Sequence, residues 1–161
     1  MGTTARNLVG SVDVKDLVAR LNLLHNANVA TMYWSHAVQN RLAGQALQLH
    51  VGDELDEVAE QSLGDARRLA DRIAELGGAV TADLGDIVEQ SPFDDYALPD
   101  DTSDVTSILE YALQQIRTVI RAYADVLDMV RGRDDLTYRL VADLLGHVVH
   151  REDELEAVLD G

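Results

Sequence analysis

Apolar residues recur three and four positions apart in four long stretches of the chain. This spacing places them on one face of an α-helix. The stretches predict helices over about 13–42, 52–76, 103–131 and 134–159. The apolar faces include Leu17, Leu21 and Leu24 in the first helix, Leu55, Val58 and Leu69 in the second, Val105, Ile108 and Val119 in the third, and Val141, Leu144 and Val148 in the fourth.

Capping residues support these boundaries. Ser11 or Asp13 can cap the first helix, and Thr102 or Ser103 the third, because their side-chain oxygens accept hydrogen bonds from amides of the first turn. Gly77-Gly78 follows the second helix, where glycine commonly ends a helix.

The lengths of the connections predict the topology. Short loops join the first helix to the second and the third to the fourth, so each pair should form an antiparallel hairpin. The segment over about 78–102 is much longer. A helix of about 27 residues is roughly 40 Å long, and roughly 24 residues of extended chain, at about 3.3 Å each, can run back along it. The second and third helices should therefore be parallel, joined by a long crossover in which 82–90 could form a short helix.

Composition favours a single all-α domain over 1–161. Hydrophobic residues make up 47% of the chain but aromatic residues only 4%, and Ala, Leu and Val dominate, which suits helix packing better than a β-sandwich. Both prolines, Pro92 and Pro99, lie in the expected crossover, so the helical stretches are free of this helix breaker.

The chain is strongly acidic, with a net charge of −16 and a pI of about 4.4. Lys15 is the single lysine, beside twelve arginines. Such a charge repels nucleic-acid phosphates and anionic lipids, so neither nucleic acid nor membrane is expected as a partner. A halophilic host would explain the acidity, since salt screens self-repulsion. A high-GC genome, which favours Arg over Lys and Asp over Glu, is an equal alternative.

Cysteine is absent, which excludes disulfides and thiolate metal sites. The first residues lack the apolar stretch of a signal peptide, and no apolar run reaches membrane-spanning length. A soluble cytoplasmic protein is the expectation.

Several short strings recur in the order and spacing of one known family. They are Leu8-Val9-Gly10, Leu69–Gly78, Ile108-Leu109-Glu110, Gly132–Tyr138 and the ending Glu152–Glu156. Over nearly its whole length the chain resembles the ferritin-like superfamily, most closely the Dps-like and bacterioferritin-like mini-ferritins. The resemblance implies a ferritin-like four-helix bundle with a long crossover. It also implies self-assembly, with a dimer as the minimum and a hollow twelve-subunit shell as the main expectation.

In that family, six ligands hold two irons in the bundle core: one Glu from each of the first and third helices, and a Glu-x-x-His pair from each of the others. The resemblance places these positions, with Thr31 a weaker alternative on the first helix, at Asn28, Ser62, Asp65, Ile116, Val148 and Arg151. None of the six is Glu or His. A register shift on the last helix would substitute His147 or His150, but it would leave the apolar face. The sequence therefore predicts a degenerate di-iron site, no ferroxidase activity and no resident cofactor, with iron bound only through an unconventional site.

Asp65 and Arg151 are predicted to replace the two His ligands by a core ion pair, with Asn28 and Ser62 supplying hydrogen bonds. Buried charges need partners, and hydrocarbon at positions 116 and 148 removes part of that need.

His147 and His150, three residues apart on the last helix, could form half of a metal site with Glu154, or could be ordinary partly exposed side chains. His25 and His36 lie three turns apart and cannot share one metal ion. Asp94, Asp95, Asp100, Asp101 and Asp104 crowd the crossover; they are either a solvated loop that complements a helix N-terminus or an acidic patch for cation entry.

The sequence favours a ferritin-like shell or structural subunit that stores cations or iron, serves as a scaffold, or mixes with an active paralogue. A first alternative is an iron-sequestering mini-ferritin with an intersubunit site using His147, His150, His36 or His50. A second is a partner-binding regulatory bundle. DNA protection lacks its usual basis, since only Arg6 precedes Lys15 as a basic residue.

Overall fold

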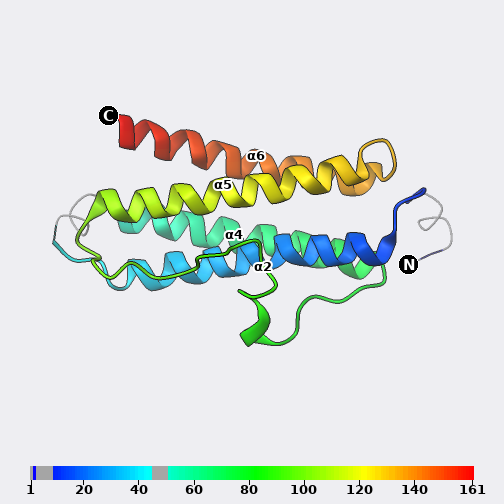
Figure 1. Ribbon diagram of the computed structural model, residues 1–161, viewed down its shortest axis with the longest axis horizontal. Helices are drawn as coiled ribbons and strands as arrows, with labels where there is room; N and C mark the ends of the chain where they lie inside the picture. The colour runs from blue at the N-terminus through cyan, green and yellow to red at the C-terminus, as the bar shows by residue number, and fades with distance from the viewer. Residues whose placement is uncertain (1, 3–8, 45–50) are drawn as a thin grey trace.

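The computed structural model describes residues 2, 9–44 and 51–161 of the chain. Four long helices form the molecule: α2 (Val14–Gln39), α4 (Val51–Glu75), α5 (Val105–Val130) and α6 (Asp135–Asp160), with a short 3-10 helix, η1 (Leu84–Asp86), between α4 and α5 (Figure 1). Every predicted helix end lies within three residues of the observed one. The described part contains no strand, and the predicted all-α four-helix bundle is confirmed.

Aspartates cap the long helices α2, α5 and α6. The Asp13 carboxylate accepts hydrogen bonds from the amides of Lys15 and Asp16 at the start of α2. Asp104 accepts from the Ser107 amide at the start of α5, so the predicted cap at Thr102 or Ser103 was wrong. The physical reason is geometric: a cap must reach the third amide of the helix, and that amide belongs to Ser107.

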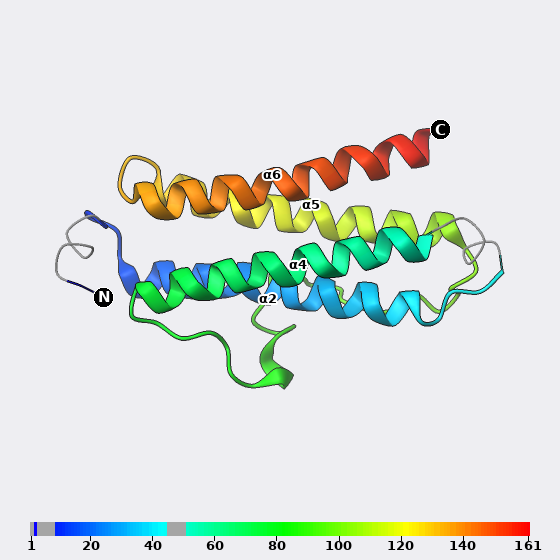
Figure 2. The same cartoon turned by 180° about the vertical axis from the view of Figure 1, so that it is seen from behind.

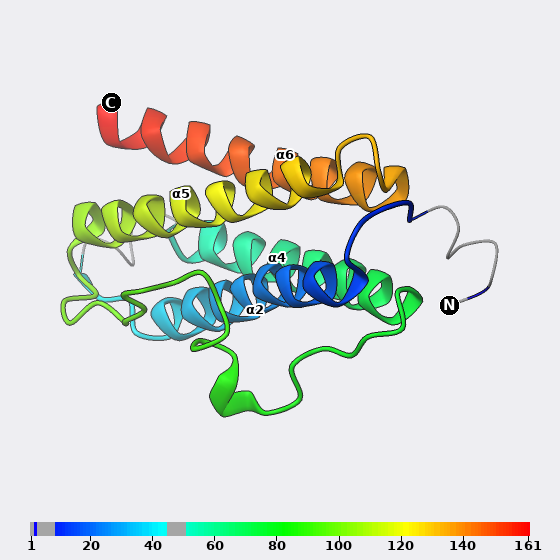
Figure 3. The ribbon, with the colours of Figure 1, turned by 45° about the vertical axis from the view of Figure 1, so that its right-hand side comes forward.

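The helices pair as two antiparallel hairpins, α2 with α4 and α5 with α6, and α4 runs parallel to α5 (Figures 1 and 2). The crossover from α4 to α5 runs back beside α2, and η1 lies within it (Figure 3). The short helix lies inside the predicted 82–90 segment. This arrangement confirms the predicted topology.

Polar side chains of α2 hold the crossover. Asn22 Nδ2 donates to the Ala79 carbonyl at 3.0 Å, and Asn26 Nδ2 donates to the Gln90 carbonyl at 2.9 Å. Further along, the Trp34 indole donates to the Ala97 carbonyl at 2.8 Å. These bonds satisfy crossover carbonyls that helix or sheet pairing would otherwise satisfy.

Two apolar clusters fill the bundle. The larger contains Leu17, Leu21 and Leu24 with side chains from all four helices, and the smaller surrounds Trp34 and Val38 at the opposite end. No helix in the described ranges is both long and apolar enough to cross a membrane.

Candidate functional site

All six positions that the resemblance assigns to iron ligands lie inside the bundle. Each of the following side chains is less than a tenth exposed: Asn28 on α2, Ser62 and Asp65 on α4, Ile116 on α5, and Val148 and Arg151 on α6. The helical periodicity therefore located the interior correctly at every one of these positions.

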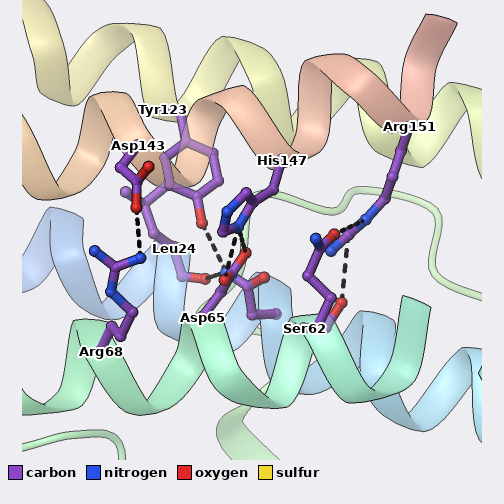
Figure 4. Close-up of polar contacts among 10 residues, drawn as sticks. Leu24, Ser62, Asp65, Arg68, Tyr123, Asp143, His147 and Arg151 are labelled. Atoms are coloured by element: carbon purple, nitrogen blue, oxygen red, sulfur yellow. Dashed lines mark hydrogen bonds and ion pairs between the residues drawn. The ribbon is translucent and has the colours of Figure 1, made fainter. Parts of the chain in front are cut away.

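Asp65 is bound by His147, which projects from α6 across the bundle (Figure 4). His147 Nδ1 lies 3.0 Å from Asp65 Oδ1 and 3.1 Å from Oδ2. Burial raises the pKa of the Asp65 carboxyl, while the His147 hydrogen bond and the nearby charges of His147, Arg151 and Arg68 oppose that rise. Asp65 is thus a buried carboxylate whose contact is a half-exposed imidazole.

The predicted Asp65–Arg151 ion pair was wrong. Arg151 Nε donates instead to Gln61 Oε1 at 2.6 Å, and Nη1 lies 3.4 Å from Ser62 Oγ (Figure 4). The cause is the register of two antiparallel helices: His147 lies opposite Asp65. Arg151 is one helical turn further along α6 and therefore lies opposite the turn of α4 that precedes Asp65.

The third nitrogen of Arg151 has no hydrogen-bond partner among the described residues, although it is buried. Burial lowers the pKa of the Arg151 guanidinium, and the charge of Asp65 acts in the opposite direction. Both direct partners, Gln61 and Ser62, are neutral. Arg151 is therefore a buried cation without a carboxylate in contact, as far as the described chain extends.

The polar role of Tyr123 was not predicted from the sequence. Its side chain is fully buried on α5, and its hydroxyl accepts a hydrogen bond of 2.8 Å from Asn28 Nδ2. Asn28 Nδ2 also donates to the Leu24 carbonyl at 2.9 Å, so Asn28 serves Tyr123 rather than the predicted ion pair. Burial raises the pKa of the Tyr123 phenol. A tyrosine inside an apolar stripe was the available signal, because a buried hydroxyl needs a partner.

A second buried arginine was also missed. Arg72 on α4 places Nη2 at 3.2 Å from both carboxylate oxygens of Asp134, which caps α6, and Nε donates to Thr137 Oγ1 at 2.9 Å. Arg72 Nη1 binds the exposed Glu75 carboxylate at 2.9 Å. Every nitrogen of this guanidinium has a partner.

A cavity of about 560 Å³ opens between the two hairpins at the Arg151 end of the bundle. Its wall is mainly apolar and aromatic and includes Trp34, Phe93 and Ile108. Arg151 and Ser35 also line it, and the buried Ser35 hydroxyl lacks a partner within the described ranges.

The other candidate residues are dispersed. His150 is exposed and contacts Glu154 at 3.1 Å, His25 contacts its neighbour Asn26, and His36 is exposed near the end of α2. His50 lies outside the described residues. Nowhere in the described chain do three His, Cys, Asp or Glu side chains gather as potential metal ligands.

Two carboxylates at the end of the crossover accept hydrogen bonds from residues close to them in the sequence. Asp104 caps α5, and Asp101 accepts hydrogen bonds from the amide and the hydroxyl of Ser103. These bonds lower the pKa of both carboxyls. Asp94, Asp95 and Asp100 are exposed.

Known proteins resemble this chain over most of its length. A family model described as a ferritin-like domain matches residues 15–161. The "DNA protection during starvation protein" of Pyrococcus furiosus is 25% identical over 154 residues, covering 93% of this chain and 80% of that protein.

Solved structures agree with this relationship. A dodecameric thioferritin, the bacterioferritin-related protein of Bacteroides fragilis, superposes with a TM-score of 0.88 at 25% identity, covering 98% of this chain and 92% of that one. The Dps protein of Vibrio cholerae, at 16% identity, shares the fold with a TM-score of 0.82 over 91% of this chain and 90% of its own. The predicted resemblance to Dps-like and bacterioferritin-like mini-ferritins is confirmed, and the chain belongs to the ferritin-like family.

Proposed function

We propose that this chain is a ferritin-like shell or structural subunit without its own ferroxidase centre. The observation that carries the proposal is the chemistry of the six buried positions assigned to iron ligands. They offer one amide, one hydroxyl, one carboxylate, two hydrocarbon side chains and one guanidinium. Ferrous iron prefers carboxylate and imidazole donors, so this set does not fit a di-iron centre.

The polar members of this set are engaged with protein groups. Asn28 binds Tyr123, Asp65 binds His147, and Arg151 binds Gln61. A metal ion would have to break these bonds and remain near a buried cation. Asp65 and His147 together supply one carboxylate and one imidazole, far fewer donors than two irons require.

The assembled form in this proposal is a homo-oligomer, with a twelve-subunit shell as the leading arrangement. Support comes from likeness over nearly the full chain to a thioferritin described as dodecameric. Such a shell would store cations, act as a scaffold or include an active paralogue. Size-exclusion chromatography with light scattering at high salt measures the assembly, and a monomer would refute the shell.

The decisive experiment is anaerobic titration of the metal-free protein with Fe²⁺ in high salt, followed by oxygen, with ferric absorbance recorded. We expect no saturable binding and oxidation at the protein-free rate. The matched comparison is a variant that restores the family's ligands at all six positions: Asn28→Glu, Ser62→Glu, Asp65→His, Ile116→Glu, Val148→Glu and Arg151→His. Its helicity is checked by circular dichroism.

Saturable binding with fast oxidation by the unaltered chain would refute the proposal. It would favour the alternative site between subunits, which uses exposed histidines such as His36 and His150 together with His147. Replacement of each of these by Ala would then locate the site.

A further inference from the structure

The cavity at the Arg151 end has the composition of a small-molecule site. Its volume of about 560 Å³ lies in the usual range for ligand pockets, roughly 300–1,000 Å³. It is lined by the second halves of α2 and α6, the first halves of α4 and α5, and aromatic residues of the crossover. Ligand pockets are mostly apolar walls with a few placed polar groups, and this cavity has that character.

Two residues that line it each carry a buried polar atom without a hydrogen-bond partner in the described chain, Arg151 Nη2 and Ser35 Oγ. Arg151 is 7% exposed and Ser35 1%. Leaving a buried charged donor without a partner is costly, more so than for a neutral group. The cost disappears when a ligand supplies the missing acceptor.

Charge identifies that acceptor. Arg151 contacts only the neutral side chains of Gln61 and Ser62, while the nearby carboxylate of Asp65 is held by His147. A guanidinium prefers a carboxylate to a neutral acceptor, because the opposite charges attract and the two planar groups can form two parallel hydrogen bonds. Arg72 shows this preference in the same molecule through its contact with Asp134.

From these observations we propose that the cavity binds an amphipathic monocarboxylate, a medium-chain fatty acid, whose carboxylate pairs with Arg151 and whose hydrocarbon chain lies against Trp34, Phe93 and Ile108. The cavity shares Asn28, Ile116, Val148 and Arg151 with the positions of the iron ligands, but the proposed ligand needs no metal and goes beyond the shell function.

The acidic residues of the cavity narrow the ligand class. Glu54, Glu57 and Glu154 line it and are exposed, and His150 contacts Glu154. Their charges repel anions, so ligands with several negative charges, such as citrate or nucleotides, are disfavoured relative to a ligand with one. A ligand with one charge and a long apolar body can place that charge at the buried guanidinium and fill the apolar space behind it.

The test uses the metal-free protein in its native assembly and the fluorescence of Trp34, the chain's single tryptophan. Octanoate and the neutral 1-octanol are titrated separately so that their affinities can be compared. A bromo-octanoate with bromine at the far end of its chain serves as quencher. We expect saturable quenching and at least about a tenfold preference for octanoate over octanol. In the series butanoate, hexanoate and octanoate, affinity should rise about fourfold per methylene.

Arg151→Met should remove the preference for octanoate while leaving octanol binding intact, which also shows that the variant retains the cavity. Arg68→Met is the matched control, because Arg68 pairs with Asp143 and does not line the cavity. It should bind both ligands as the unaltered chain does. Ala112→Phe, which places a ring in the cavity wall, should weaken both ligands.

Three results would overturn the proposal. The first is no saturable quenching by the bromo-octanoate, and the second is equal affinity for octanoate and octanol. The third is an octanoate preference that survives Arg151→Met, since the carboxylate would then bind elsewhere.

Discussion

Two arginines are buried in the described part of this bundle, and they differ in whether carboxylates contact them. Arg72 is 6% exposed and meets the Asp134 carboxylate, Thr137 and Glu75. Arg151 is 7% exposed and, among the described residues, meets only Gln61 and Ser62. Side chains of the protein bind every nitrogen of the Arg72 guanidinium, whereas Arg151 borders a cavity. A buried arginine therefore forms a structural ion pair where a carboxylate contacts it, and burial alone does not define one.

The largest expected effect comes from breaking the Arg72 contact. Arg72→Met leaves the buried Asp134 carboxylate without a cation in contact, which should cost about 3–5 kcal/mol of unfolding free energy. Arg151→Met leaves no carboxylate without its contacting cation, so it should change the unfolding free energy by less than about 1 kcal/mol in either direction. Urea unfolding of the two variants measures the difference.

Arg68→Met provides the exposed reference for that pair of variants. Arg68 and Asp143 side chains are 47% and 55% exposed, and such pairs contribute about 0–1 kcal/mol. Equal losses in Arg72→Met and Arg151→Met would contradict the comparison, since the carboxylate would then have no special effect.

A smaller effect on unfolding free energy is expected when a carboxylate is placed beside Arg151. Gln61→Glu keeps the shape of the side chain that accepts from Arg151 Nε and gives it a negative charge, so the bond then joins two opposite charges. Unfolding free energy should rise by about 0.5–1 kcal/mol. This gain in unfolding free energy must vanish in an Arg151→Met background. An equal gain there would mean that it comes from general surface charge and not from the contact with Arg151.

The smallest expected effect concerns pH. Burial raises the pKa of Asp65 above its ordinary 3.8, so the folded protein holds this proton more tightly than the unfolded chain. The stability contributed by protonated Asp65 is present below pH of about 3.8 and is lost as pH rises through the raised pKa. Asp65→Asn has no proton to lose. The difference in unfolding free energy, wild type minus variant, should therefore fall across that window in urea titrations.

A His147→Gln background tests the cause of this pH dependence. His147 holds the pKa of Asp65 down against burial, so without it the fall should be larger. A difference that increases with pH in either background would mean that the positive neighbours outweigh burial.

The sequence predicted the helices and the interior because both depend on periodicity within one segment. Asn28, Ser62 and Val148 are buried as the apolar stripes required. The crossover followed from chain length alone. The cap of α5 was missed because Thr102, Ser103 and Asp104 are adjacent candidates, and only the position of the Ser107 amide selects Asp104.

The contacts between helices were not predictable in the same way. Pairing His147 with Asp65 and Arg72 with Asp134 depends on the register of α4 against α6, which differs by a full turn between neighbouring alternatives. The cavity exists because side chains from four helices do not fill the space between the hairpins. No pattern within one segment of the sequence predicts this.

The attachment of the crossover to α2 has a consequence for local unfolding. Its carbonyls at Ala79, Gln90 and Ala97 are bound by side chains of α2, not by neighbouring backbone. The crossover can therefore detach without breaking any hydrogen bond of the helical ladders. Its amide protons should exchange with solvent faster than those of α2, and protease cleavage should begin there while the four helices stay folded.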